Sequence, residues 1–466
     1  MHAWTKKWTT FVASSAIAFT AFTATNEDAE AKSKKKETPQ NIIFLIGDGM
    51  GNSYTSAYRY LQNTPSKQFV SQTTLDRYLI GQQMTYPEDP VQNVTDSASA
   101  ATAMSAGVKT YNNAIAVDND RQNVKTVLER AKELGKSTGL VATSEITHAT
   151  PAAFGAHDES RKNMDAIADD YFDERVKGKH KIDVLLGGGK SNFIRTNRDL
   201  TKEFKQAGYN YVTDLESLQK NKKGQLLGLF ADGGLPKKID RSADVPSLAN
   251  MTDAALKQLS TNKKGFFLMI EGSQIDWAGH DNDIVGSMSE MADFDAAFKR
   301  AIAFAKKDKN TLVVATADHS TGGFSIAAGG DYNWKPEAIK AFTKTPDYIA
   351  QQIVDGANVE QALKQYIQLD LTNKEIDSVK QAATSNKLTT IDNAIEAIAD
   401  QRSNTGWTTG GHTGEDVNVY AYGPHASDFA GQIDNTDQAK LIFKLLEQKS
   451  KTKTVIHDAQ MTEGSH

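Results

Sequence analysis

Carboxylates and histidines cluster in the sequence just after predicted strands. Asp48, Glu271 and Asp318 each come at most two residues after an apolar run. The carboxyl ends of parallel strands form the edge of an α/β sheet at which ligands bind. Carboxylate and imidazole groups are also common metal ligands. The sequence therefore predicts a metal centre at this edge, with the candidate ligands Asp48, Thr150, Glu271, Asp276, His280, Asp318, His319 and His412.

The spacing within this group fits more than one metal ion. Asp276 and His280 are four residues apart, so a helical turn or a loop can direct both toward one ion. Asp318 and His319 are adjacent and converge only if the backbone is irregular after the strand, while His412 adds a third nitrogen. Two Asp/His sets would account for two zinc ions. The surplus oxygen donors suit magnesium with bound water; they are Thr150 and Glu271.

A serine stands at the start of a helix of small residues. Ala98–Ala106 has almost no bulk, and Asp96 or Thr95 can act as its N-cap. Ser97 would then lie among free N–H groups that favour an anion. Alone, this pattern is more typical of an ordinary helix cap. Beside paired metal ions, which ease deprotonation of a bound oxygen and hold the oxygens of a displacement at phosphorus, Ser97 becomes a candidate nucleophile.

One arginine has the chemistry to bind an oxyanion. Arg161 follows the polar loop 143–151 and could hold two oxygens with its fork. Without that context, an exposed ion pair would be the more usual role of such a residue.

The composition excludes several kinds of site. The chain has 466 residues, a formal net charge of −5 and no cysteine. Disulfides, thiolate metal sites and thiol nucleophiles are therefore excluded. The mild charge balance gives no sign of a nucleic-acid-binding surface.

The N-terminal residues 1–31 resemble a secretory signal peptide. Lys6 and Lys7 precede the apolar run Trp8–Ala24, and Ala29-Glu30-Ala31 provides a small-x-small cleavage site. The apolar run is short for a membrane span, so an uncleaved membrane anchor is the weaker alternative. We expect cleavage near Ala31, secretion, and no membrane span in the mature chain.

Buried strands alternate with helices along the rest of the chain. Continuous apolar runs of this kind are typical of parallel strands buried on both faces. The predicted strands include 41–46, 138–142, 182–186, 265–270, 310–316 and 417–422, and the predicted helices include 122–134, 284–305 and 436–446. Residues 326–404 are instead polar and helical, which indicates a helical insertion. We predict an α/β fold with a large, mostly parallel central sheet, and a single catalytic domain over residues 32–466.

Several short motifs occur in the order seen in alkaline phosphatases, and the chain resembles bacterial members of that family from about residue 41 to 425. Each motif is weak alone, but the ordered set is specific. The motifs are Gly47-Asp48-Gly49-Met50-Gly51, Thr95-Asp96-Ser97-Ala98, Lys109-Thr110-Tyr111-Asn112, His148-Ala149-Thr150-Pro151, Ser160-Arg161, Glu271-Gly272-Ser273, Asp276 with His280, Thr316-Ala317-Asp318-His319 and Gly411-His412-Thr413.

This resemblance implies a three-layer sandwich with helices on both faces of the sheet, and a phosphomonoesterase that depends on two zinc ions and one magnesium ion. Ser97 resembles the nucleophile that forms a phosphoserine. Arg161 resembles the group that binds phosphate, oriented by Asp96. A homodimer and phosphate monoester substrates are also implied. The implied ligand sets are Asp276, His280 and His412 for one zinc, Asp48, Asp318 and His319 for the other, and Asp48, Thr150 and Glu271 for magnesium.

Two positions depart from the best-known enterobacterial pattern. His148 stands where that pattern has aspartate, so zinc could enter the third site, and Trp277 stands where it has lysine. Two other functions remain open. One is a phosphodiesterase or nucleotide pyrophosphatase of the same superfamily, which typically has a threonine nucleophile and lacks the arginine and the third metal. The other is a non-enzymatic protein that binds phosphate or zinc.

Overall fold

A ten-stranded sheet runs through the described part of the chain, in the order β16-β2-β15-β10-β1-β9-β3-β6-β8-β7. The computed structural model describes residues 38–63 and 69–448, so the predicted signal peptide and its cleavage site lie outside the described residues. Neighbouring strands are parallel except at β15, which is antiparallel to both β10 and β2. The strands are β1 (Asn41–Gly47), β2 (Leu79–Met84), β3 (Ser137–Glu145), β6 (Val184–Gly188), β7 (Asn210–Val212), β8 (Leu226–Leu229), β9 (Phe266–Gly272), β10 (Thr311–Ala317), β15 (Val417–Tyr422) and β16 (Gly431–Asp434).

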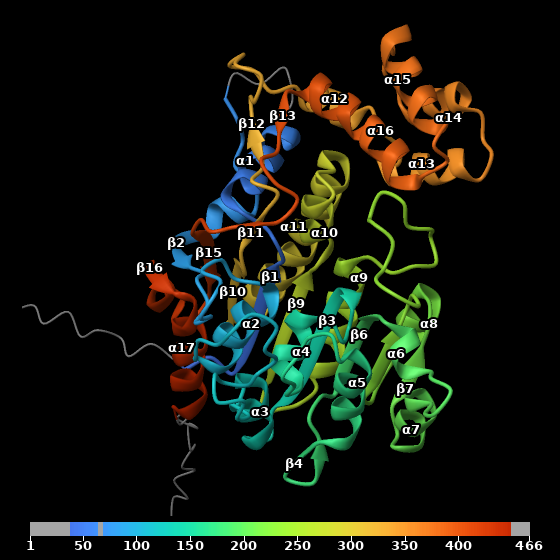
Figure 1. The fold of residues 1–466 in the computed structure, drawn as a ribbon. Helices are drawn as coiled ribbons and strands as arrows, with labels where there is room; N and C mark the ends of the chain where they lie inside the picture. The colour runs from blue at the N-terminus through green and yellow to red at the C-terminus, as the bar shows by residue number, and fades with distance from the viewer. Residues whose placement is uncertain (1–37, 64–68, 449–466) are drawn as a thin grey trace, which may run out of the picture. The chain divides into compact units, whose positions relative to one another are not determined.

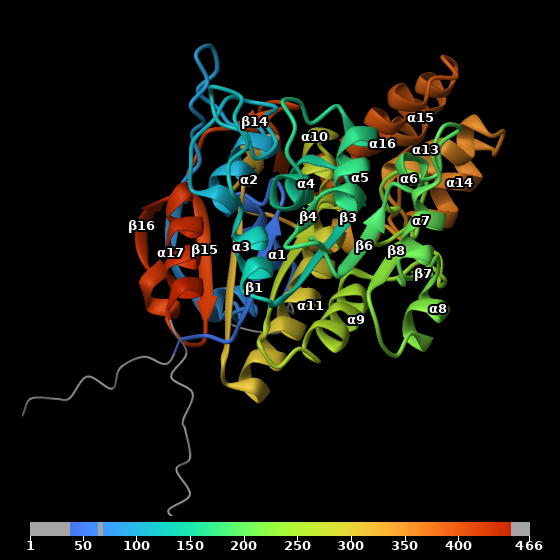
Figure 2. The same ribbon diagram turned by 90° about the horizontal axis from the view of Figure 1, so that it is seen from below.

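Helices cover both faces of this sheet (Figures 1 and 2). Alternate side chains of β1 enter two separate cores, Ile43 and Leu45 on one face and Phe44 and Ile46 on the other. The predicted three-layer α/β fold is therefore confirmed. The first face is covered by α1 (Asn52–Gln62), α9 (Leu248–Leu259) and α11 (Ile284–Asp308), and the second by α2 (Ser97–Ala106), α3 (Val127–Glu133), α4 (Ala149–Gly155), α5 (Met164–Asp173) and α17 (Asn435–Glu447).

Shorter elements lie around this frame. They are α6 (Lys190–Phe193), α7 (Leu200–Gln206), α8 (Leu215–Lys220), α10 (Gln274–His280), the 3-10 turns η1 (Leu75–Tyr78) and η2 (Ala426–Phe429), and the paired short strands β4 (Arg175–Val176) with β5 (Lys179–His180) and β11 (Ser320–Thr321) with β14 (His412–Thr413). Within the described residues, no helix is long and apolar enough to cross a membrane.

Five consecutive helices form a separate group, at the top of Figure 1, which we call the five-helix segment. The chain enters it after β12 (Ser325–Ile326) and leaves it into β13 (Thr405–Gly406), and these two strands pair with each other. The segment therefore starts and ends at one place, as expected for the helical insertion predicted near 326–404. Its helices are α12 (Pro336–Lys340), α13 (Pro346–Val354), α14 (Val359–Tyr366), α15 (Asn373–Ala383) and α16 (Leu388–Ser403).

The helix predicted over 122–134 is shorter than expected. The side chain of Thr126 accepts from the backbone N–H of Glu129, and the Glu129 side chain accepts from the backbone N–H of Thr126. This capping box starts α3 at Val127. The helical prediction for residues 122–126 was therefore wrong.

We expect Phe44→Ala to destabilise the fold strongly, because Phe44 is fully buried in β1 and its ring lies 6.0 Å from that of Phe154. A loss of ~3–5 kcal/mol in the free energy of unfolding is typical for such a cavity. Urea unfolding of the zinc-loaded protein measures it. The matched control, Phe69→Ala, removes a ring that is 77% exposed and should change stability by less than ~0.5 kcal/mol. Equal losses in the two variants would contradict this packing.

Candidate active site

The predicted metal ligands come from the carboxyl ends of three adjacent strands and from three connecting elements. Asp48 follows β1, Glu271 is the second-last residue of β9, and Asp318 with His319 follows β10. In the sheet β1 lies between β10 and β9, so these side chains meet at one edge. α10 carries Asp276 and His280, the first turn of α4 carries Thr150, and β14 places His412 opposite Thr321.

The first group of ligand atoms joins α10 to β14. The Nε2 atom of His280 lies 3.4 Å from Asp276 Oδ2 and 3.1 Å from His412 Nε2. His412 Nε2 lies 3.6 Å from Asp276 Oδ1. His412 donates from Nδ1 to the carbonyl of Thr95, and His280 donates from Nδ1 to the carbonyl of Gly410. A carbonyl only accepts, so in the neutral form of each ring the proton is on Nδ1 and the Nε2 lone pair is available to a metal ion.

The second group lies between β1 and β10. Ligand atoms of Asp48, Asp318 and His319 are all within 4.8 Å of one another. His319 Nε2 is 3.2 Å from Asp318 Oδ2 and 3.5 Å from Asp48 Oδ1. The Oγ atom of Ser97 is 3.1 Å from the same nitrogen. The predicted nucleophile therefore lies directly beside the second group.

The third group contains a histidine that the sequence analysis did not place among the ligands. Ligand atoms of Asp48, Glu271 and His148 lie within 4.8 Å of one another. The Oγ atom of Thr150 is buried, with no hydrogen-bond partner among the described residues. His148 is the N-cap residue of α4, and the ring of Trp277 packs edge-on against it at 5.7 Å. The signal was present in the sequence, because His148 is two residues before Thr150.

Unpaired buried oxygens indicate that these groups fit cations. Both carboxylate oxygens of Asp48, Oδ2 of Asp318 and Oε1 of Glu271 are buried, and the described part of the chain gives them no hydrogen-bond partner. Buried carboxylates without a partner are strongly unfavourable. The first two groups offer carboxylate and imidazole donors, as zinc prefers. The third offers mainly oxygen, as magnesium prefers, with one imidazole added.

The pKa values of the same side chains show how strongly burial and charge act here. Burial, with the charges of Asp318 and Asp276, raises the pKa of Asp48 well above its usual value. Burial also raises the pKa of Glu271 to about 7. Burial, with the nearby Arg161 charge, lowers the pKa of His148 to about 3, so its ring is neutral and can accept a hydrogen bond.

The helix that carries Ser97 is anchored by its cap. The side chain of Asp96 accepts from the backbone N–H of Ser99 at 2.9 Å, so Asp96 and not Thr95 is the N-cap. Gly107 ends α2 with a φ of 77°. Ser97 is 1% exposed at the first position of the helix. The small side chains that follow let α2 pack closely between α4 and α17.

Arg161 is held from two sides. Its Nη1 donates to Asp96 Oδ2 at 3.0 Å, and its Nη2 donates to the neutral His148 Nε2 at 3.1 Å. The Asp96 side chain therefore contacts both the Ser97 helix and the arginine. This arrangement fixes the guanidinium next to Ser97 and leaves other N–H groups of the fork for a ligand.

Two further residues shape the centre and were not singled out from the sequence. Thr321 Oγ1 donates to Asp276 Oδ1 at 2.5 Å and lies 3.3 Å from His319 Nδ1, so it links the first two groups. Gly49 has a φ of 69°, and a Cβ there would lie 2.7 Å from Thr321 Oγ1 and 2.8 Å from the Asp276 Cα. A side chain at this position would push the groups apart.

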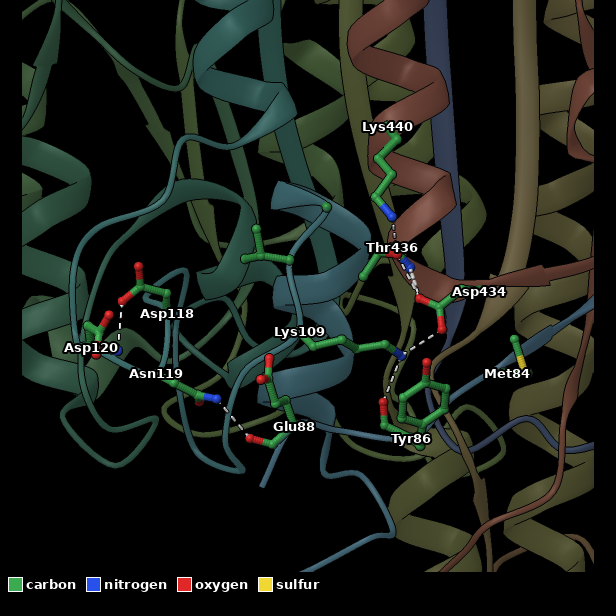
Figure 3. A pocket seen from close by; sticks show the side chains of 12 residues that line it. Met84, Tyr86, Glu88, Lys109, Asp118, Asn119, Asp120, Asp434, Thr436 and Lys440 are labelled. Atoms are coloured by element: carbon green, nitrogen blue, oxygen red, sulfur yellow. Dashed lines mark hydrogen bonds and ion pairs between the residues drawn. The ribbon is translucent and has the colours of Figure 1, made fainter. Parts of the chain in front are cut away.

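A hollow of about 690 Å³ lies elsewhere, and none of the predicted site residues lines it (Figure 3). Lys109 in its wall donates to the Tyr86 carbonyl at 2.7 Å and to Asn435 Oδ1 at 2.6 Å, and it pairs with Asp434 at 3.2 Å. Lys440 donates to Thr436 Oγ1. Both lysines are thus held by groups of the wall itself, and the hollow is separate from the candidate active site.

Several known proteins are similar to this chain in sequence and fold over nearly their whole length. A model of the alkaline phosphatase family matches residues 39–448. Alkaline phosphatase 3 of Bacillus subtilis is 65% identical over 97% of this chain and 99% of its own length. A cold-active alkaline phosphatase from a Shewanella species is 42% identical, covers 88% of this chain and 100% of its own, and superposes with a TM-score of 0.83.

The alkaline phosphatase of the Antarctic bacterium TAB5 is 31% identical, with a TM-score of 0.65 over 89% of this chain and 100% of its own. Two variants of the TAB5 enzyme, in which a histidine is replaced by glutamate or aspartate, are described with Mg bound in the M3 site. The family match, the identities and the shared fold together lead to one conclusion: this chain belongs to the alkaline phosphatase family and is a phosphomonoesterase.

Proposed function

We propose that the chain is a secreted phosphatase that hydrolyses phosphate monoesters through a covalent phosphoserine on Ser97. The observation that carries this proposal is the position of Ser97 Oγ. It lies at the N-terminus of α2, 3.1 Å from a nitrogen of the second ligand group, and the residue before it, Asp96, holds the Arg161 guanidinium. These neighbours suit a nucleophile that attacks a dianionic phosphate.

Two transfer steps account for the reaction. Ser97 Oγ gives up its proton and forms a bond to phosphorus, the bond from phosphorus to the substrate oxygen breaks, and the alcohol leaves with a proton. A water molecule then attacks phosphorus, the Oγ–P bond breaks, and Ser97 regains a proton as inorganic phosphate leaves. Arg161 binds two phosphate oxygens in both steps, and Asp96 keeps its fork in place.

Two zinc ions and one magnesium ion are proposed as cofactors, in the ligand sets named above. When bound, they supply positive charge that lowers the pKa of the serine hydroxyl and of water and that stabilises the leaving oxygen. Asp48, between the second and third groups, would serve both. His148 adds an imidazole to the third group, so we propose that this site takes magnesium but tolerates zinc.

Secretion and dimerisation complete the proposal. Secretion is supported by the basic, apolar and small-residue pattern of residues 1–31. A homodimer is supported by the family alone. Phosphate monoesters are the proposed substrate class, because Ser97, Arg161 and the metal ligands would all act on the phosphate group.

We expect Ser97→Ala to lower kcat for p-nitrophenyl phosphate by at least ~10³-fold, because the bond to phosphorus can no longer form on Oγ. Acid quenching with labelled phosphate should trap a phosphoserine in the wild type only. The matched control is Ser105→Ala on the same helix, whose buried hydroxyl donates to the Ala153 carbonyl at 2.6 Å. It should keep kcat and lose about 1 kcal/mol of stability.

The same assay separates the other functions. The zinc- and magnesium-loaded protein should turn over bis(p-nitrophenyl) phosphate poorly, and EDTA should abolish monoester turnover. Rapid diester cleavage with little monoester turnover, or full activity of Ser97→Ala, would contradict the proposal.

We expect His148→Asp to raise the magnesium content of the third site relative to zinc, because an oxygen donor replaces a nitrogen donor. Metal analysis after equilibration with both ions measures the ratio. His425→Asn, at the N-cap of η2 and outside the ligand groups, is the control; its φ of 66° is one that asparagine tolerates. An unchanged ratio in His148→Asp would remove His148 from the third site.

A further inference from the structure

A second group of carboxylates lies outside the candidate active site, where α10 meets the five-helix segment. Asp281 directly follows α10, and Asp392 and Glu396 lie on α16, one helical turn apart. One carboxylate oxygen from each of these residues lies within 4.8 Å of the other two. We call these three residues the junction carboxylates.

Two of the junction carboxylates, Asp392 and Glu396, are buried and each has an unpaired oxygen. Asp392 is 2% exposed and Glu396 is 6% exposed. The Oδ1 atom of Asp392 and the Oε1 atom of Glu396 are buried, and no hydrogen bond reaches either atom from the described residues. Each of the two buried carboxylates that α16 brings to Asp281 therefore has an oxygen without a hydrogen-bond partner in the described chain.

The surrounding charge is strongly negative. Lys237 pairs with Asp281 at 3.3 Å and with Asp283 and Asp347 at 3.5 Å, and Asp283 is itself only 1% exposed. One ammonium group therefore already serves three carboxylates. Burial and these neighbouring charges raise the pKa of Asp392 to about 9 and that of Glu396 to about 10. The interior at this place favours either protons or an added cation.

We propose that the junction carboxylates bind a calcium ion. The donors are all carboxylate oxygens, which are typical ligands of calcium and not of zinc-selective sites. Calcium accepts six to eight oxygens in a flexible geometry, whereas magnesium requires a near-ideal octahedron, so three carboxylates from two separate elements suit calcium better. Asp281 and Asp347 also line a hollow of about 450 Å³, which gives an ion and its remaining water ligands a route from solvent.

A second polar cluster, whose members are half-buried, shows the contrast. Glu129, His157 and Glu174 also bring ligand atoms together, between α3 and α5. There Lys181, which is 1% exposed, pairs with Glu174 and lies 3.9 Å from Glu129. That cluster already contains its cation, whereas Lys237 has no contact with Asp392 or Glu396 among the ion pairs of the described chain.

The proposed ion would couple the five-helix segment to a zinc-ligand helix. Asp281 is the residue after His280, and the backbone N–H of Asp281 donates to the Trp277 carbonyl at the end of α10. A calcium ion on Asp281, Asp392 and Glu396 would hold this end of α10 against α16. Its role is structural, and it does not depend on how phosphate is cleaved.

Calcium binding to the full-length holoenzyme tests the proposal. The protein is kept in zinc and excess magnesium, so that the catalytic groups stay occupied, and Ca²⁺ is titrated by calorimetry. We expect the wild type to take up one Ca²⁺ per chain at this place and to gain a few degrees in Tm. Asp392→Asn/Glu396→Gln should lose this uptake and the Tm shift. The matched control, Asp377→Asn, changes an exposed carboxylate on α15 and should retain both.

The stability and zinc content of the double variant show whether a loss of Ca²⁺ uptake results from unfolding. Since Asn and Gln have nearly the shape of the protonated acids and need no counter-charge, it should be at least as stable as calcium-free wild type and should keep its zinc content. Equal Ca²⁺ uptake by wild type and double variant would overturn the proposal. So would the absence of any Ca²⁺-dependent Tm shift in the wild type, or saturation of the junction carboxylates by Mg²⁺ with no response to Ca²⁺.

Discussion

Unpaired negative charge at the carboxyl edge of the sheet is the constraint on which the catalytic half of the molecule depends. Asp48, Glu271, Asp276 and Asp318 are at most 3% exposed and converge from adjacent elements. Histidines compensate for only part of this charge, and several oxygens have no partner within the described chain. Such an arrangement is costly without bound cations. Bound metal ions would compensate this buried negative charge. Metal binding at this centre should therefore increase the stability of the fold.

The positions of the Ser97 and Arg161 side chains follow from close packing around the metal-ligand groups. The small residues of α2 bring its N-terminus, and with it Ser97, to within 3.1 Å of His319. Gly49 lets the chain after β1 approach Asp276 and Thr321, where any Cβ would collide. Asp96 joins the helix cap to Arg161. Close packing and the contacts of Asp96 thus fix where Ser97 and Arg161 lie. The charges around them determine which ligands they can bind.

The buried strands and the ligands that follow them could be predicted from the sequence. A continuous apolar run marks the strand, and the carboxylate or histidine after it marks the candidate ligand. The strand β2 could not be predicted, since it reads Leu-Ile-Gly-Gln-Gln-Met and has no alternation of apolar and polar residues that marks a strand. The helix α9 was also missed in a stretch without chemistry. Thr321 could not be assigned, because its role depends on pairing between β11 and β14, ninety residues apart. The junction carboxylates likewise join residues that are over a hundred positions apart.

The short helix α10 lies between the first ligand group and the junction carboxylates. α10 has seven residues, too few to be stable alone, and it carries Asp276 and His280 of the first ligand group. Its first end is fixed by contact with the sheet, where the Ser273 N–H donates to Thr143 Oγ1. Its last end is held by the bond from His280 to the Gly410 carbonyl and by the ion pair of Asp281 with Lys237, and it faces the acidic side of α16. If that side repels Asp281, the position of His280 loosens; if a cation joins them, it tightens. The five-helix segment is then part of what orients a zinc ligand, although none of its own residues reaches the active site.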